Sequence, residues 1–229
     1  WLKLEHLQVG GSFKARGMLN RLLANPMPAS GVIVASGGNA GIATAAAARA
    51  LGVACEVFVP EVSPEAKRAR LRDLGATVVV TGASYAEAYE ACVARQRQTG
   101  ALMTHAYDQS EVVAGAGTLA REIEAQGGRA PDSVLVSVGG GGLIGGVAAW
   151  FEQRCRVVAL EPEGAPTLFR AREAGLMHLD RDDRGLANDS IVVNGKQIVN
   201  PLNQEVVTLR GIAMGEYTVN AHYYESKDG

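Results

Sequence analysis

The residues with the clearest chemical potential are four consecutive glycines, Gly139-Gly140-Gly141-Gly142, which lie between a β-prone run and a helical segment. Because glycine has no side chain, the backbone N–H groups of such a loop can converge on an anion, and the following helix N-terminus adds partial positive charge. The run therefore predicts a phosphate site, with a tight turn for helix–sheet packing as the alternative. No Lys-Ser or Lys-Thr follows it, which argues against a nucleoside-triphosphate loop.

A second segment, Ser36-Gly37-Gly38-Asn39, also lies between a strand-like run and a helical segment. Its two polar side chains can donate hydrogen bonds and its glycines expose N–H groups, so the segment suits a carboxylate ligand. Serine and asparagine are also good helix N-caps, so capping is the alternative.

A lysine follows a third glycine pair, in Gly10-Gly11-Ser12-Phe13-Lys14, at the start of a further helix. Such a lysine is usually a solvated charge. Near a helix N-terminus and in an apolar pocket, however, the neutral amine is favoured, as a Schiff-base nucleophile requires.

The elements that must position these segments alternate in type. Short β-branched runs occur at residues 32–34, 57–59, 78–80, 134–136 and 157–159, and helical segments occur at 40–51, 64–74, 84–98, 111–125 and 143–153. Apolar strands joined by crossover helices predict an α/β fold with doubly wound parallel sheets, whose ligands bind at the carboxyl ends of the strands. Residues 1–5 read as one more strand.

The 229 residues have a globular composition, with 47% hydrophobic residues, 20% charged residues and a formal net charge of -2. This balance excludes the disordered and fibrous classes and predicts neither a nucleic-acid partner nor a membrane partner. No membrane span and no signal peptide are evident, and Cys55, Cys92 and Cys155 form neither a disulfide framework nor a metal pattern. These features predict a cytoplasmic protein.

The composition changes near residue 175, because alanine is frequent before that point and sparse after it. Residues 190–199, 205–210 and 217–224 are β-prone, and Asn194-Gly195 is a hairpin signal. We therefore predict a small antiparallel β tail over residues 176–229.

Taken together and in this order, the three glycine-rich segments resemble the catalytic-lysine, substrate-carboxylate and cofactor-phosphate loops of the serine/threonine dehydratase family. These are pyridoxal-phosphate enzymes of fold type II, the tryptophan synthase β-like fold. The resemblance covers residues 1–175 and includes Glu5-His6-Leu7-Gln8, Arg16-Gly17, Phe58-Val59-Pro60 and His105-Ala106-Tyr107-Asp108. It implies a larger cofactor-binding domain formed by residues 1–30 and 109–175, and a smaller α/β domain over 31–108.

The resemblance also implies a role for each site residue. Lys14 would hold pyridoxal 5'-phosphate covalently and remove the substrate's α-proton, and Phe13 would pack near the cofactor ring. Asn39 would hydrogen-bond the ring's 3'-oxygen, and together with Ser36 and Gly37 it would bind the substrate. The phosphate would be bound by the backbone of Gly139, Gly140, Gly141, Gly142 and Leu143.

The implied activity is that of a serine/threonine ammonia-lyase, which eliminates the β-hydroxyl of its substrate to give a 2-oxo acid and ammonia. The family resemblance also suggests a homodimer. Because family members extend beyond both ends of the matched region, we expect a fragment or chimera of reduced or no activity. Three alternatives remain: a β-replacement enzyme of the cysteine synthase type, a non-catalytic cofactor-binding fragment, and a dinucleotide-binding module, for which Glu161 lies at about the expected 20-residue distance from the glycine loop.

Two departures from the relatives bear on the chemistry. Racemases of this family usually carry a serine at the position of Gly37 as a second acid/base, so racemisation is disfavoured here. Some relatives bind a divalent cation through a glutamate at the position of Glu161 and a later aspartate, where this chain has Thr167. We therefore expect no metal site and interpret Glu161 as a solvated carboxylate at a strand end.

Overall fold

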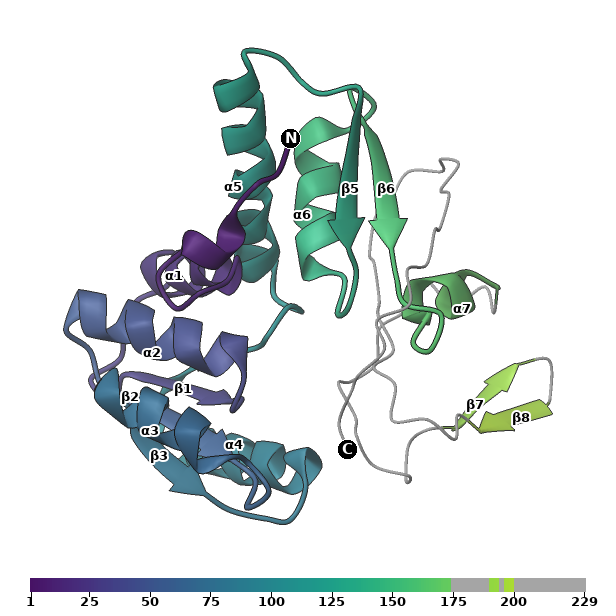
Figure 1. Ribbon diagram of the computed structural model, residues 1–229. Helices are drawn as coiled ribbons and strands as arrows, with labels where there is room; N and C mark the ends of the chain where they lie inside the picture. The colour runs from purple at the N-terminus through teal and green to yellow at the C-terminus, as the bar shows by residue number, and fades with distance from the viewer. Residues whose placement is uncertain (174–189, 194–195, 200–229) are drawn as a thin grey trace. The chain divides into compact units, whose positions relative to one another are not determined.

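The computed structural model describes residues 1–173, 190–193 and 196–199. The chain divides into two compact units, Trp1–Leu119 and Ala120–Gly229, and the long helix α5 (Ser110–Gly127) runs across the division (Figure 1). The division of the chain into a discontinuous larger domain and a smaller domain stays a prediction. Among the described helices, none is long and apolar enough to cross a membrane.

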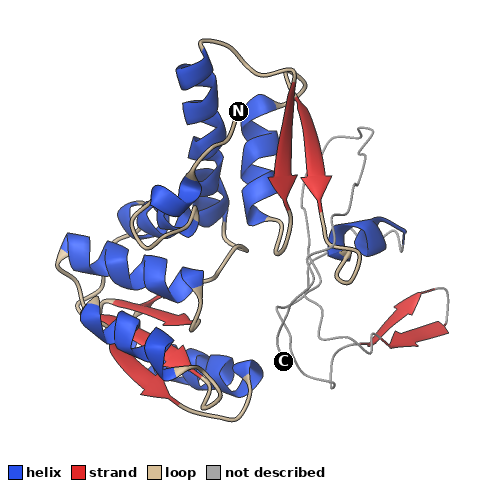
Figure 2. Ribbon diagram, viewed as in Figure 1, coloured by secondary structure: helices blue, strands red, loops and turns tan. Residues whose placement is uncertain are grey.

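The first unit is built around a four-stranded parallel sheet of order β3-β2-β1-β4. Its strands are β1 (Val32–Ala35), β2 (Cys55–Val59), β3 (Thr77–Val80) and β4 (Leu102–Thr104). The crossover helices that alternate with them are α2 (Asn39–Leu51), α3 (Glu65–Asp73) and α4 (Tyr85–Thr99) (Figure 2). Since β1 and β2 are neighbours, the loops that leave their carboxyl ends emerge side by side.

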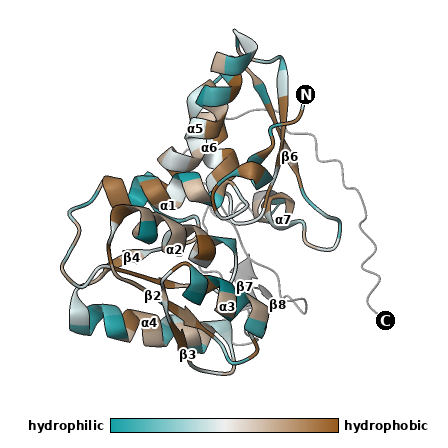
Figure 3. Cartoon of the chain, turned by 60° about the vertical axis from the view of Figure 1, so that its left-hand side comes forward, coloured by the Kyte–Doolittle hydropathy of each residue, from teal (hydrophilic) through white to brown (hydrophobic). Residues whose placement is uncertain are grey.

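Both faces of the two central strands, β1 and β2, are largely buried, as their unbroken apolar runs predict. On one face, Val32 and Val34 share a core with Leu71 of α3, and on the other face Ile33 shares a core with Cys92 of α4. The strands are hydrophobic, whereas the helix α3 that packs on them is largely hydrophilic, as Figure 3 shows.

Before the sheet, the chain forms a short 3-10 helix η1 (Glu5–Leu7) and the helix α1 (Lys14–Leu23). The strand predicted over residues 1–5 is therefore wrong. The N–H of Leu7 donates to the carbonyl of Leu4 at 3.1 Å, so the backbone turns here instead of extending. Helix α1 packs on α2 and α5, where Met18 is fully buried with Ala43 and Val112.

In the second unit, β5 (Ser133–Ser137) and β6 (Arg156–Leu160) are parallel neighbours connected by α6 (Gly142–Phe151). Helix α6 buries Ile144, Val147 and Phe151. Helix α7 (Thr167–Glu173) follows β6, and β7 (Ser190–Val193) pairs with β8 (Lys196–Val199) in antiparallel register.

The α/β class with parallel sheets is confirmed, and all ten predicted strands and helices of residues 32–160 form with small shifts at their ends. Strand β4 and helix α7 were not predicted. The predicted tail strands at 205–210 and 217–224 lie outside the described residues, so the small β tail stays a prediction.

Candidate active site

Lys14 is the first residue of α1, and its half-buried amine faces the connection between β4 and α5. Its Nζ donates a hydrogen bond to the backbone carbonyl of Ala106 at 2.6 Å. The same atom lies 5.0 Å from the centroid of the Phe13 ring and 5.8 Å from that of the Tyr107 ring, within the range in which an aromatic face attracts a cation. These contacts exclude the alternative of a freely solvated lysine.

The segment that carries Lys14 approaches α5 closely. A Cβ on Gly17 would lie 2.7 Å from the carbonyl oxygen of Val112, and a Cβ on Gly115 would lie 2.5 Å from the carbonyl oxygen of Arg16. Glycine is required at both positions because any side chain would push α1 and α5 apart. The Arg16 side chain adds a hydrogen bond from Nη1 to the Thr118 hydroxyl at 3.2 Å.

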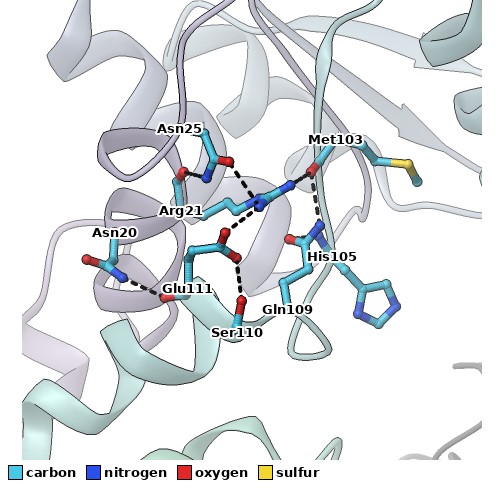
Figure 4. Close-up of polar contacts among 8 residues, drawn as sticks. All are labelled: Asn20, Arg21, Asn25, Met103, His105, Gln109, Ser110 and Glu111. Atoms are coloured by element: carbon cyan, nitrogen blue, oxygen red, sulfur yellow. Dashed lines mark hydrogen bonds and ion pairs between the residues drawn. The ribbon is translucent and has the colours of Figure 1, made fainter.

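The β4–α5 connection, residues 105–109, is held by a polar network that Figure 4 displays. The Gln109 side chain spans it, since its Oε1 accepts from the N–H of His105 at 2.9 Å and its Nε2 donates to the carbonyl of Met103 at 3.1 Å. Arg21 of α1 donates to the same Met103 carbonyl at 3.3 Å and pairs with Glu111 at 3.0 Å. The Ala106 carbonyl that accepts from Lys14 therefore belongs to an anchored segment.

The charge of Glu111 in this network is favoured by its surroundings. A hydrogen bond from its own backbone N–H, followed by one from the Ser110 hydroxyl and the charge of Arg21, lowers the pKa of the Glu111 carboxyl. The ionised carboxylate is the form that pairs with Arg21, so this pair persists at neutral pH.

Residues 36–39, here named the carboxylate loop, connect β1 to α2. The Ser36 hydroxyl accepts from the N–H of Gly38 at 3.3 Å. Gly38 is the N-cap of α2, and no side chain caps the N–H groups of the first helical turn. Ser36 and Asn39 therefore do not serve as side-chain caps of α2, and Asn39 is exposed. A Cβ on Gly41 would lie only 1.9 Å from the Ser36 carbonyl oxygen, so the first turn of α2 packs directly on this loop.

In the second unit, residues 139–142 connect β5 to α6 and are here named the glycine loop. Gly141 is the α6 N-cap and has a φ of 75°, which favours glycine, and no side chain caps the helix. The N–H of Gly142 donates to the carbonyl of Gly140 at 3.0 Å, which closes the turn. A Cβ on Gly139 would meet nothing within 4 Å, so the space beside this residue is open. The first turn of α6 holds no acidic residue that would repel an anion. An anion would meet backbone and a helix N-terminus here, with no side chain to displace it.

The interpretation of Glu161 as a solvated carboxylate is wrong. Its side chain is only 3% exposed, and its two oxygens accept from the Thr167 hydroxyl at 2.9 Å and from the N–H groups of Leu168 and Phe169 at 2.7 and 3.0 Å. A glutamate at a strand end normally stays exposed, but here the chain folds back and presents the amino end of α7 to it. Within the described residues, no cluster of three His, Cys, Asp or Glu residues could hold a metal ion.

The chain also matches known proteins. Residues 1–204 match the family described as "Pyridoxal-phosphate dependent enzyme". The chain belongs to the pyridoxal-phosphate-dependent enzyme family. The resemblance and the cofactor class predicted from the three glycine-rich segments are thereby confirmed.

Several proteins similar to this chain are named as threonine ammonia-lyases, dehydratases or deaminases. The chain is 40% identical over 182 residues to an L-threonine ammonia-lyase of Geobacter sulfurreducens, covering 76% of this chain and 44% of that protein. It is 32% identical to the biosynthetic L-threonine dehydratase IlvA of Bacillus subtilis, covering 90% of this chain and 51% of the relative. The crystal structure of a threonine deaminase from T.th. superposes with a TM-score of 0.69 at 35% identity, covering 89% of this chain and 69% of that one. The chain thus spans about half the length of these curated relatives.

The residues of each unit fit the chemistry of the family's cofactor. In the first unit, Lys14 offers an amine beside two aromatic rings, and the carboxylate loop adds an exposed amide side chain at Asn39. In the second unit, the glycine loop places side-chain-free backbone at the N-terminus of α6. An aldehyde that reacts with an amine and a phosphate that binds N–H groups are the two ends of pyridoxal phosphate.

Sequence reasoning missed three residues of this site. Gln109 and Arg21 hold the β4–α5 connection, and Ser63 lies beside the carboxylate loop. The signal for Ser63 was available, because it follows the strand next to β1 and so leaves the same edge of the sheet.

Proposed function

We propose that this chain carries the cofactor-binding and catalytic residues of a pyridoxal-phosphate-dependent L-threonine or L-serine ammonia-lyase. The names of its relatives support the reaction and the substrate class. The observation that carries the proposal is the placement of the Lys14 amine, which is hydrogen-bonded to the Ala106 carbonyl and lies near the rings of Phe13 and Tyr107.

When bound, pyridoxal phosphate supplies an electron sink for the negative charge that develops at the substrate's α-carbon. Lys14 would hold the cofactor covalently, and its Nζ would be the group that takes the substrate's α-proton. The Ala106 carbonyl keeps that amine in place, because a hydrogen-bond acceptor at 2.6 Å restricts the rotamers of a long side chain.

The carboxylate loop and the glycine loop would bind the two anionic groups, the substrate carboxylate and the cofactor phosphate. Ser36, Gly37 and the first turn of α2 would bind the substrate carboxylate. Asn39 would hydrogen-bond the cofactor ring, and Phe13 would pack near that ring. The phosphate would be bound by the backbone of Gly139, Gly140, Gly141, Gly142 and Leu143.

The overall reaction balances without an added oxidant or reductant. L-threonine loses its α-proton and its β-hydroxyl as water and leaves as an enamine. Hydrolysis of the enamine consumes one water and gives 2-oxobutanoate and ammonia, and L-serine gives pyruvate in the same way.

The test is to load the purified chain with pyridoxal phosphate, reduce it with borohydride and map the modified lysine by peptide mass spectrometry. We expect the label on Lys14 and expect Lys14→Ala to abolish both the label and 2-oxobutanoate formation. Lys67→Ala, which removes an exposed lysine of α3, is the matched control and should change neither. A label on another lysine would contradict the assignment.

Feeding L-serine with sulfide separates the lyase from the β-replacement alternative. Pyruvate formation without cysteine supports the ammonia-lyase, whereas cysteine without pyruvate would replace it with a cysteine synthase activity. Cofactor binding without either product would support the non-catalytic alternative. The cytoplasmic location and the homodimer stay predictions.

A further inference from the structure

Ser63 occupies the space that a side chain at position 37 of the carboxylate loop would need. A Cβ on Gly37 would lie 3.2 Å from Ser63 Oγ, which is tighter than most contacts of a Cβ, and 3.4 Å from Val59 Cγ1, which is at the edge of ordinary contact. Position 37 therefore favours glycine, because the Ser63 hydroxyl from the β2–α3 turn lies where a side chain of the loop would otherwise be.

The turn that carries Ser63 is fixed from several directions. The N–H of Ser63 donates to the carbonyl of Pro60 at 3.0 Å, and the N–H of Glu61 donates to the carbonyl of Gly82 at 2.8 Å. Arg68 of α3 donates to the carbonyl of Glu61. Because the backbone is held in this way, the fold sets the position of the Ser63 Cβ beside the carboxylate loop.

The hydroxyl of Ser63 is available to a ligand. Ser63 is half-buried, and among the described residues its Oγ makes no hydrogen bond. A hydroxyl has one donor and two acceptor positions, so at this location its donor is left for a group that binds to the loop.

We propose that Ser63 is a substrate-binding residue whose hydroxyl donates to the substrate carboxylate held by residues 36–39. This inference rests on the proposed function, because it takes the carboxylate loop as the substrate site. The neighbouring strands β1 and β2 thus each contribute a serine, Ser36 from the loop and Ser63 from the adjacent turn.

The test measures binding as well as turnover in the cofactor-loaded protein. L-alanine is the probe because it has the carboxylate but no leaving group, and L-alaninol is the matched probe without a carboxylate. We expect Ser63→Ala to weaken L-alanine binding about tenfold by calorimetry, the loss typical of one hydrogen bond to a charged group. Ser63→Ala should leave L-alaninol binding unchanged. Ser63→Thr keeps a hydroxyl and should retain most of the L-alanine affinity. Val62→Ala alters an exposed neighbour and should change the affinity for neither probe.

A double-mutant cycle tests the geometry independently. Gly37→Ala should lower the melting temperature, because its new Cβ crowds Ser63 Oγ. In the Ser63→Ala background the crowding falls, since the nearest atom of residue 63 is then its Cβ at 3.8 Å. Gly37→Ala should therefore lower the melting temperature less in the Ser63→Ala background than in the wild type.

The outcomes separate this inference from the proposed function. If the wild type forms 2-oxobutanoate and Ser63→Ala leaves L-alanine affinity unchanged, the Ser63 role is overturned and the lyase function stands. Equal weakening of L-alanine and L-alaninol also overturns it, because that result indicates a general distortion. If L-alanine binding depends on Ser63 but no 2-oxo acid forms, the Ser63 role stands and the lyase function fails. A wild type that does not bind L-alanine overturns the Ser63 role as well.

Discussion

Arg16 forms a bidentate ion pair with the Glu5 carboxylate, in which its Nε and Nη2 each donate to one carboxylate oxygen at 2.7 Å. The two side chains are only 12% and 14% exposed. Paired donors of this kind have a defined orientation and are stronger than hydrogen bonds between neutral groups. Since Lys14 lies two residues before Arg16, this pair fixes the start of α1 against η1 and sets the direction from which the lysine leaves the helix.

Glu5→Ala should therefore destabilise the first unit markedly. Removing the carboxylate deprives the largely buried Arg16 guanidinium of its bidentate, charged partner, which we expect to cost about 2–3 kcal/mol of unfolding free energy. Urea unfolding measures the cost. Glu65→Ala breaks the exposed Arg72–Glu65 pair and is the control, with little expected change. Equal effects of the two variants would contradict the anchoring role of Glu5.

Gln109→Glu should impair turnover more than stability. The substitution keeps the acceptor for the His105 N–H but replaces the donor to the Met103 carbonyl with a charged oxygen, so the segment around Ala106 shifts. A small displacement of a catalytic group lowers kcat by about ten- to a hundredfold. We expect that loss in kcat with KM nearly unchanged, measured as 2-oxobutanoate formation. Gln98→Glu on the exposed side of α4 should leave both constants as they are.

The regular elements were predictable because their signals are local. The β-branched run at Val32-Ile33-Val34 and the alanine-rich stretch that follows specify a buried strand and its crossover helix without reference to the rest of the chain. The same holds for the glycine loop, whose lack of side chains is visible in the sequence itself.

The partners of the site residues were not predictable, because they depend on contacts between distant segments. Nothing near Lys14 in the sequence indicates Ala106, and nothing near Gly37 indicates Ser63. The burial of Glu161 was missed for the same kind of reason. Its acceptors are satisfied by a helix, α7, whose sequence carries no clear signal.

Gly139→Ala and Gly41→Ala should separate a ligand-binding glycine from a packing glycine. A Cβ on Gly139 meets open space, so the melting temperature of the cofactor-free protein should be unchanged while affinity for pyridoxal phosphate falls. A Cβ on Gly41 would overlap the Ser36 carbonyl oxygen, so that variant should lose about 3 kcal/mol of stability or more. Thermal unfolding and cofactor titration of both variants test the distinction, and a Gly139 variant with normal cofactor affinity would remove the phosphate role from that residue.

Glu161→Ala should destabilise the second unit without any link to metal ions. The substitution removes the acceptor from the Thr167 hydroxyl and from two backbone N–H groups, which we expect to cost about 2–3 kcal/mol. Chelation with EDTA or addition of Mg²⁺ should leave the melting temperature of the wild type unchanged. A rise in melting temperature with Mg²⁺ that disappears in Glu161→Ala would instead establish a metal site.

The buried thiols of Cys55 and Cys92 should make the first unit lose stability at alkaline pH. Burial, and secondly the charge of Glu56, raises the pKa of each thiol to about 12. In the unfolded chain a thiol ionises near its ordinary pKa of about 8.5, so above that pH the folded state holds more protons than the unfolded state. Stability from this source is complete below a pH of about 8.5 and declines as the pH rises toward about 12, by roughly 1 kcal/mol per pH unit for each thiol. Urea unfolding at about pH 8 and about pH 10 should therefore show a smaller decline in Cys92→Ala than in the wild type, and identical declines would mean that this thiol ionises normally in the folded protein.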